Sequence, residues 1–281
     1  MPVIIKNLTH TYAAGTPFEK KALDDITLTI NDGEFIGLIG HTGSGKSTLI
    51  QHINALMMPT SGKVFVDGID TTEPKSGLEI RKHVGIVFQY PEYQLFEETI
   101  EKDASFGPRN LGLDEEEIKS RVHHALRICG IDESLFDHSP FDLSGGQKRR
   151  VAIAGVLAMR PKILILDEPA AGLDPAGRRD MRNLIRSIRD DGATVIMVSH
   201  SMDDVSKMCD RIIVMNKGTI ALNGTPEVVF KESELLESIH LGVPAASKLR
   251  EKLNEKGMNI PDSVYTIEGL KTAIIQRLKR S

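Results

Sequence analysis

The chain has 281 residues, of which 40% are hydrophobic and 26% are charged, and its formal net charge is −4. This composition is typical of an ordinary globular protein with a substantial core, built as about two domains of roughly 150 residues or as one elaborated domain. The small negative charge excludes a global attraction to nucleic acid or to anionic lipid, so binding of a polyanion would need a local patch.

The first third of the chain has strand character. Apolar and polar positions alternate in residues 3–8, 22–30 and 34–39, with breaks at residues 13–17 and at a turn signal, Asp32–Gly33. We expect antiparallel strands here. Residues 64–70 predict a hairpin with its turn at Asp67–Gly68, and residues 84–88 predict a buried strand, so a mixed sheet is expected.

Helical patterns follow, beginning at about residue 97 and ending at about residue 160. Residues 114–130 form a clear helical segment, with Asp114 as the expected N-cap and Gly130 as the expected stop. Three runs rich in β-branched residues come next, around one more helical segment: 162–167, 194–200 and 211–218 around 177–192. Alternating strands and helices predict a parallel sheet, into which residues 97–160 are inserted as a helical lobe.

The remaining residues, 226–281, have helical spacing of leucine and isoleucine between prolines, in segments 233–242, 246–257 and 267–281. They fit a helical cap on the domain and a subunit contact equally well. The two cysteines, Cys129 and Cys209, lie far apart without CxxC spacing, and we expect them to be reduced. The nine histidines show no metal-ligand spacing, so zinc is not expected.

No targeting segment is predicted. The first twelve residues lack the basic and long apolar regions of a secretory signal. The longest apolar runs are strand-sized and far short of the ~18 residues that cross a bilayer. If the protein works at a membrane, we expect another chain to bring it there.

Residues 40–47, GHTGSGKS, fit the phosphate-loop pattern G-x-x-x-x-G-K-[ST] after a run of strand character. Glycines allow successive backbone N–H groups to converge on an anion at the start of the following helix. Lys46 supplies a charge for the outer phosphates, and Ser47 a hydroxyl ligand for Mg²⁺. The expected nucleotide-binding residues are Tyr12, Gly40, His41, Thr42, Gly43, Ser44, Gly45, Lys46, Ser47 and Thr48.

A second set of polar residues ends the later strands. Residues 164–169, LILDEP, place Asp167 and Glu168 at the end of a strand expected beside the phosphate loop. Asp167 is predicted to hold Mg²⁺, and Glu168 to act as general base on the attacking water. His200 ends the run 194–200 and fits a hydrogen bond to the terminal phosphate, although by itself a strand-end histidine is more often structural.

Residues 143–147, LSGGQ, open a helical segment and provide a second anion cradle in Ser144, Gly145 and Gly146. With these motifs in order, the sequence resembles the nucleotide-binding subunits of ABC transporters to about residue 225. That resemblance implies a P-loop NTPase fold with an antiparallel β subdomain, an inserted helical subdomain and a C-terminal helical extension from residue 226. It also implies a head-to-tail dimer that binds ATP between the phosphate loop of one subunit and LSGGQ of the other.

The resemblance assigns further roles. Tyr12 is expected to stack on adenine, and Gln89 to reach Mg²⁺ and the attacking water. Asp174 in AGLD is expected to cross the dimer interface, although alone it is typical of a helix cap. Ala170 stands where the family usually has threonine after DEP, which puts one hydroxyl contact in doubt. The residues expected to contact ATP bound by the partner subunit are Leu143, Ser144, Gly145, Gly146, Gln147 and Asp174.

A narrower resemblance covers residues 88–96, FQYPEYQLF, together with FGPRNLGL and the segment around LSGGQ. These strings resemble the second of two paralogous ATPases in energy-coupling factor importers of vitamins or metals. The resemblance implies three partners: a paralogous ATPase, a membrane scaffold that docks near Gln89 to Phe96, and a substrate-binding membrane subunit. It also implies a peripheral position on the cytoplasmic side of the cell membrane. An apolar groove wall and core packing both remain open for Tyr90, Tyr93, Leu95 and Phe96.

One basic stripe needs no ligand. Four arginines follow helical spacing, and we expect a solvated face paired with Asp180 and Asp190 in preference to a polyanion site. They are Arg178, Arg182, Arg186 and Arg189.

The predicted function is therefore a transport ATPase with ATP and Mg²⁺ at its site. A soluble ABC protein acting on nucleic acid or ribosomes is the first alternative, but such proteins usually carry two cassettes or a long coiled coil. A regulatory subunit that binds ATP without hydrolysing it is the second, and Glu168 and His200 argue against it.

Overall fold

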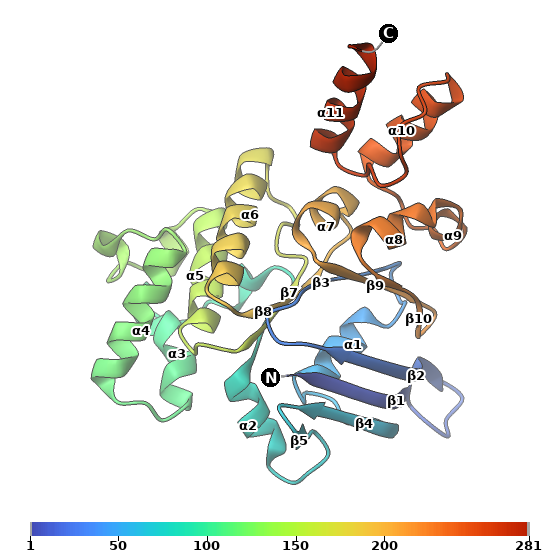
Figure 1. Ribbon diagram of the computed structural model, residues 1–281. Helices are drawn as coiled ribbons and strands as arrows, with labels where there is room; N and C mark the ends of the chain where they lie inside the picture. Colours follow the sequence, from blue (N-terminus) through green and yellow to red (C-terminus); the bar gives the residue numbers. More distant parts are fainter. Residues whose placement is uncertain (1, 280–281) are drawn as a thin grey trace.

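The computed structural model describes residues 2–279, which fold around two β-sheets with helices on their faces (Figure 1). The last two residues of the expected helix 267–281 lie outside this range. The first sheet is antiparallel and has the strand order β2-β1-β4-β5. Its strands are β1 (Val3–Tyr12), β2 (Lys20–Ile30), β4 (Ser61–Val66) and β5 (Ile69–Asp70). The predicted hairpin at Asp67–Gly68 is present, because Val66 pairs with Ile69 across it.

The second sheet has six strands in the order β10-β9-β3-β8-β7-β6. All neighbours are parallel except β10, which is antiparallel to β9. The strands are β3 (Phe35–Gly40), β6 (Val84–Val87), β7 (Ile163–Asp167), β8 (Thr194–Val198), β9 (Arg211–Asn216) and β10 (Thr219–Gly224).

The assignment of residues 34–39 to an antiparallel arrangement was wrong. β3 pairs in parallel with β8 and β9 in the second sheet. All six of its residues are buried, whereas β2 alternates buried and exposed positions toward its end. A strand at the centre of a parallel sheet has both faces covered and is apolar throughout.

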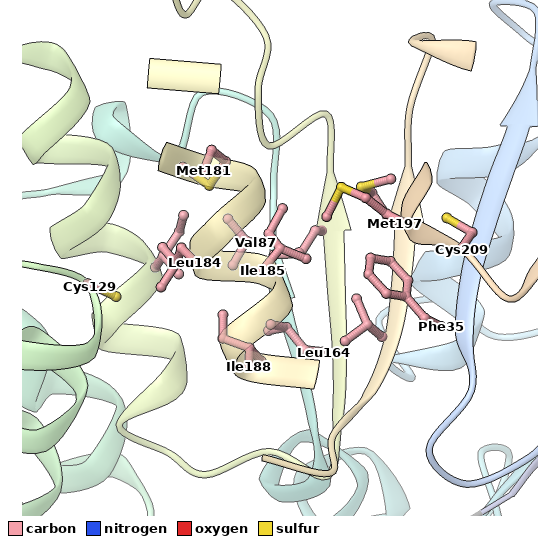
Figure 2. Packing of buried hydrophobic residues seen from close by; sticks show 14 of the residues in the cluster. Phe35, Val87, Cys129, Leu164, Met181, Leu184, Ile185, Ile188, Met197 and Cys209 are labelled. Carbon is pink, nitrogen blue, oxygen red and sulfur yellow. The ribbon is translucent and has the colours of Figure 1, made fainter. Parts of the chain in front are cut away.

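Two hydrophobic cores lie on opposite faces of the second sheet, because successive side chains of a strand point to opposite faces. Along β7, Ile163 and Ile165 face the core shared with the antiparallel sheet. Leu164 and Leu166 face the other and larger core, which we call the main core. In the main core, Figure 2 shows Leu164 and Val87 beside α6 (Pro175–Asp190), and Phe35 farther along the sheet toward Met197 and Cys209. The buried residues of α6 have the i, i+3, i+4, i+7 spacing of an apolar helix face: Met181, Leu184, Ile185 and Ile188.

The helical lobe lies between β6 and β7 in the sequence and to one side of the sheet in Figure 1. Asp114 caps α4 by accepting a hydrogen bond from the Glu117 N–H, as predicted, and Gly130 follows the helix with φ 70°. The helices of the lobe are α3 (Ile100–Asn110), α4 (Glu115–Ile128) and α5 (Gly145–Leu157), with the short 3₁₀ turns Pro91–Gln94, Glu133–Leu135 and Pro140–Asp142 around them.

Among the remaining helices, α1 (Lys46–Ile53) and α7 (Met202–Met208) pack against faces of the parallel sheet. α1 contributes Leu49, Ile50 and Ile53 to the core between the two sheets. The sequence analysis did not predict the short helices α2 (Ser76–His83), α7 and α8 (Pro226–Lys231), or the edge strand β10. The pattern typical of a buried helix face is weak in such short elements.

The C-terminal residues divide into two parts. α8 and α9 (Ser233–Ser238) pack on the main core through Val229, Phe230 and Leu236. α10 (Ala245–Glu255) and α11 (Ile267–Leu278) form a separate small core, and α11 carries the C-terminal end away from the sheets in Figure 1. The architecture as a whole is the predicted α/β fold, with a mixed sheet, an antiparallel β sheet, an inserted helical lobe and C-terminal helices.

Candidate active site at the carboxyl ends of the parallel strands

The phosphate loop joins the end of β3 to the start of α1 and depends on its glycines. Gly43 and Gly45 have φ values of 80° and 107°, in the left-handed region that favours glycine. A Cβ atom on Gly45 would lie 2.6 Å from the carbonyl oxygen of Ala22, and one on Gly40 would lie 2.5 Å from Ser44 Oγ. The loop therefore closes on itself and against the antiparallel sheet, with no room for a side chain at Gly40 or Gly45, whereas Gly43 faces open space and is favoured by its φ alone.

Lys46, the first residue of α1, is almost completely buried. Its Nζ donates to the carbonyl oxygens of Gly40 (2.7 Å) and His41 (3.1 Å). Burial lowers the pKa of Lys46, and the charges of Glu168 and Asp167 oppose that shift. Because an ammonium group has three N–H donors, the loop leaves one for an anion.

A pocket of about 150 Å³ opens beside the loop. Tyr12 borders it from the end of β1, and its hydroxyl lies 3.1 Å from Thr48 Oγ1 on α1. Tyr12 is 40% exposed, so part of it is accessible from the pocket side of β1. The pocket is lined by Tyr12, Lys20, Ala22, Gly43, Gly45, Lys46, Ser47 and Thr48.

His41, Thr42 and Ser44 complete the loop from its other side. The His41 ring nitrogens lie 2.8 Å from the Thr42 carbonyl oxygen and 3.1 Å from Asn216 Oδ1 at the end of β9. Ser44 is fully buried, and its carbonyl oxygen accepts a hydrogen bond from the Gly218 N–H. These contacts fix the loop to the end of β9, the strand beside β3.

Asp167 is the last residue of β7, and Glu168 follows it with the unusual φ of 52°. The Glu168 N–H donates to the Val198 carbonyl oxygen, which holds this strained residue at the end of β8. Burial, and then the charge of Asp167, raises the pKa of Glu168 to about 7, against opposing effects of Lys46 and the backbone of His200. A carboxyl group with this pKa suits a general base near neutral pH.

His200 approaches Glu168 from the loop after β8, with its Nε2 3.6 Å from Glu168 Oε1. Burial, and then the charge of Lys46, lowers the pKa of His200, which favours the neutral imidazole. Burial also raises the pKa of Asp167, while Lys46 lowers it. Asp167, Glu168, His200 and Lys46 therefore lie in one electrostatically coupled site.

The site fits a nucleotide with its Mg²⁺ ion. Within residues 2–279, two buried oxygens at the site lack hydrogen-bond partners, namely Ser44 Oγ in the phosphate loop and Glu168 Oε1. The neighbouring groups are a cation, an exposed serine hydroxyl and two carboxyl groups, which suit phosphate and a hard divalent ion. Among the residues described, no cluster of three or more His, Cys, Asp or Glu side chains is arranged to hold a metal alone.

Leu143–Gln147 lies at the start of α5, in the helical lobe. Ser144 caps the helix, and the Gln147 side chain accepts a hydrogen bond from the Ser144 N–H in return, which completes a capping box. A Cβ atom on Gly145 or Gly146 would meet no atom of the described chain within 4 Å. The internal packing of this chain therefore gives no reason for glycine at either position.

The segment 89–96, which we call the docking segment, follows β6. Gln89 is exposed, as are the rings of Tyr90, Tyr93 and Phe96. Leu95 is buried in the main core. Core packing therefore holds for Leu95 and not for the three exposed aromatic residues, for which the groove wall stays a prediction.

Asp174 caps α6 by accepting a hydrogen bond from the Gly177 N–H at 2.7 Å.

The prediction that the α6 arginines pair with Asp180 and Asp190 was wrong, because the arginines have other partners. Arg182 pairs with Asp204 and Arg189 with Asp210, both on the segment after β8, while Asp180 pairs with Arg150. Spacing within one helix does not reveal such tertiary partners.

Ala170, at the position of the usual threonine, packs against the main core.

Sequence reasoning missed one ion pair at the edge of the site. Arg149, buried on α5, contacts Glu92 of the docking segment. Glu92 stands inside the segment 88–96 and Arg149 lies two residues after LSGGQ, but only the fold brings them together, across more than fifty residues.

Comparison with known proteins agrees with this geometry. Residues 23–171, more than half of the chain, match the family model described as ABC transporter. The chain therefore belongs to the ABC transporter family, and it is an ATPase whose hydrolysis of ATP is coupled to transport.

Its relatives define a narrower group. The energy-coupling factor transporter ATP-binding protein EcfA2 of Clostridium perfringens is 57% identical over 100% of both chains. The EcfA2 protein of Caldanaerobacter subterraneus is 56% identical over 99% of this chain and 98% of that relative.

Solved structures agree. CbiO1 of Clostridium perfringens, described as part of the ABC transporter complex CbiONQ, has a TM-score of 0.75 and 41% identity, and the match covers 89% of this chain and 98% of that one. A dimeric structure of the ATP-binding cassette MJ0796 bound to ADP and Pi has a TM-score of 0.69 and 32% identity, over 80% of this chain and 98% of that one.

Proposed function

We propose that this chain is the ATP-hydrolysing subunit of an energy-coupling factor importer and that it works as one half of a head-to-tail pair of ATPase subunits. The observation that carries this proposal is the separation of two anion-binding elements. The pocket at the phosphate loop contains none of the residues 143–147, whose two glycines leave open space at a helix N-terminus. A second subunit turned head to tail brings one element of each chain to each ATP.

In this proposal the ATP-binding residues are Tyr12 and residues 40–48. Tyr12 presents its ring face to adenine, while the backbone N–H groups of the loop and Lys46 bind the phosphates. In the second subunit, Leu143–Gln147 and Asp174 contact the same ATP from the opposite side.

Ser47, Gln89 and Asp167 are the proposed holders of Mg²⁺, with phosphate oxygens and water as the remaining ligands. When bound, Mg²⁺ neutralises the charge that develops on the phosphate oxygens during transfer. Glu168 accepts the proton of the attacking water, and His200 orients that water and the terminal phosphate. Gln89 links these groups to the docking segment.

The proposed partners are a paralogous ATPase, a membrane scaffold subunit and a membrane subunit that binds the vitamin or metal. Within residues 2–279, no helix is long and apolar enough to cross a membrane. Similarity to the energy-coupling factor ATPases supports assigning the bilayer to the partners and a peripheral, cytoplasmic position to this chain. The exposed rings of Tyr90, Tyr93 and Phe96 suit an amphipathic helix of the scaffold. Residues 1–225 then form the ATPase domain and residues 226–281 a C-terminal extension.

The test is purification of the tagged chain from detergent-solubilised membranes, with identification of the bound proteins and assay of ATP turnover. The proposal predicts an integral membrane protein and a second ATPase in the complex, and turnover that Glu168→Gln abolishes. Copurification with ribosomes or nucleic acid in place of membrane proteins would contradict it.

A further inference from the structure

One buried arginine connects three parts of the site that the motifs treat separately. Arg149 lies on α5, two residues after Gln147, and its side chain is only 3% exposed. Its guanidinium group donates to both carboxylate oxygens of Glu92, at 2.9 Å and 2.6 Å. The same group donates to the carbonyl oxygens of Pro169 (3.2 Å) and Ala171 (2.6 Å).

The acceptors belong to two different functional segments. Glu92 is in the docking segment, three residues after Gln89, and its own side chain is only 15% exposed. Pro169 and Ala171 directly follow Glu168, and the Ala171 N–H donates to the Glu168 carbonyl oxygen. Arg149 therefore contacts the segment before the helical lobe and the segment that carries the proposed general base.

The chemistry of the contact requires arginine. A guanidinium group has five N–H donors in a planar fork, which can satisfy a bidentate carboxylate and two carbonyls at once, whereas lysine has three donors on one atom. Burial, the largest single effect, raises the pKa of Glu92, but the hydrogen bonds from Arg149, a backbone hydrogen bond and the charge of Arg149 together lower it below its usual value. The pair is therefore ionised, and a charged group left alone at this depth would be strongly unfavourable.

Arg149 also lies near an exposed aromatic ring of the docking segment. The Arg149 guanidinium carbon lies 5.8 Å from the centre of the Tyr90 ring, one of the three exposed rings. A helix that packs on those rings would therefore lie beside the group that links Glu92 to Pro169 and Ala171.

We propose that Arg149 is a positioning residue that couples the docking segment to the loop carrying Glu168, so that engagement of a membrane partner sets the position of the general base. This inference rests on the function proposed above. It assigns to Arg149 and Glu92 a role in the partner-dependent step of turnover, beyond their contribution to the fold.

The test uses the full transport complex and the same ATPase pair without its membrane subunits. Arg149→Lys keeps the positive charge and removes the fork, and Glu92→Gln keeps the size of the side chain and removes its charge. Arg150→Met is the matched control, because the neighbouring Arg150 pairs with Asp180 at the surface. ATP turnover is measured against ATP concentration for each variant and for the double variant, with the thermal midpoint as a check on folding.

We expect each single variant to lower kcat of the complex about tenfold with a change in KM below about twofold, and to lower the ratio of turnover with and without membrane subunits. The double variant should be no slower than the slower single variant, because both changes break one link. The inference is overturned if the two losses multiply, if the ratio stays at its original value, or if Arg150→Met has the same effect. Failure of the proposed function looks different, because the unmodified complex would then show no turnover that Glu168→Gln removes.

Discussion

The Nε2 atom of His200 lies 3.6 Å from the Oε1 atom of Glu168. This separation is longer than a hydrogen bond, and Oε1 is a buried oxygen without a hydrogen-bond partner in the described part of the chain. The pair thus offers an acceptor with a raised pKa beside an imidazole that is favoured in its neutral form. In the function proposed above, the carboxylate accepts the proton of the attacking water and the imidazole orients that water.

Glu168→Gln should lower ATP turnover by about 10²–10⁴-fold while ATP still binds, because the amide cannot accept the proton of the attacking water. Turnover is measured by phosphate release and binding by calorimetry on the same samples. Glu237→Gln, a change of the same type at an exposed glutamate, is the control. Unchanged turnover in Glu168→Gln would remove Glu168 from the role of general base.

The ring of Tyr12 and its hydroxyl should contribute separately to nucleotide affinity. Tyr12→Ala removes the stacking face and should weaken ATP binding about tenfold, since stacking of an aromatic side chain on a base contributes about 1–3 kcal/mol. Tyr12→Phe keeps the face and loses only the hydroxyl contacts with Thr48 and with the Met57 sulfur, so its effect should be below about threefold. An equal loss in both variants would assign the affinity to the hydroxyl contact.

Substitution by alanine should have opposite effects on stability at Gly45 in the phosphate loop and at Gly146 in residues 143–147. Gly45→Ala should lower the free energy of unfolding by about 1–3 kcal/mol, because φ is 107° and the added Cβ would lie 2.6 Å from a backbone oxygen. Gly146→Ala meets open space in a helix, so the thermal midpoint should stay the same or rise. Turnover should nevertheless fall in both variants. A stable Gly146→Ala protein with full turnover would argue against contact between residues 143–147 and ATP.

Asp70 should make the stability of the antiparallel sheet depend on pH. Its hydrogen bond with Lys63, together with those from Thr72, lowers its pKa to about 2 despite burial. Because the folded state has the lower pKa, this stabilisation is complete above about pH 4 and is lost as the pH falls toward 2. Because Lys63 is largely exposed, solvent weakens its interaction with Asp70. Asp70→Asn should therefore lower the free energy of unfolding by only about 1 kcal/mol at pH 7, and by less at pH 3.

Urea denaturation at both pH values measures the Asp70 effect, with Asp190→Asn, an exposed aspartate, as control. A destabilisation equal at pH 7 and pH 3 would show that loss of packing, and not loss of the charge, causes it.

Sequence patterns predicted the long strands and helices well, because β-branched runs and cap residues such as Asp114 act locally. They assigned β3 to the wrong sheet, because neighbouring strands in a parallel sheet come from distant parts of the chain. For the site, spacing predicted candidate residues within single motifs, and their roles stay predictions. It could not predict the pairs of Arg182 with Asp204 or of Arg149 with Glu92, which depend on how the helical lobe and α6 pack.

The central proposal is that two ATPase subunits hold ATP between the phosphate loop of one and residues 143–147 of the other. Light scattering on the Glu168→Gln chain, alone and mixed with the second ATPase subunit, tests it most directly. With Mg·ATP the mass should rise from 31.0 kDa for one chain to about twice that value, and Gly146→Glu should prevent the increase while ATP still binds at Lys46. ATP-loaded protein that stays monomeric in both samples, or that dimerises equally well with Gly146→Glu, would contradict the proposal.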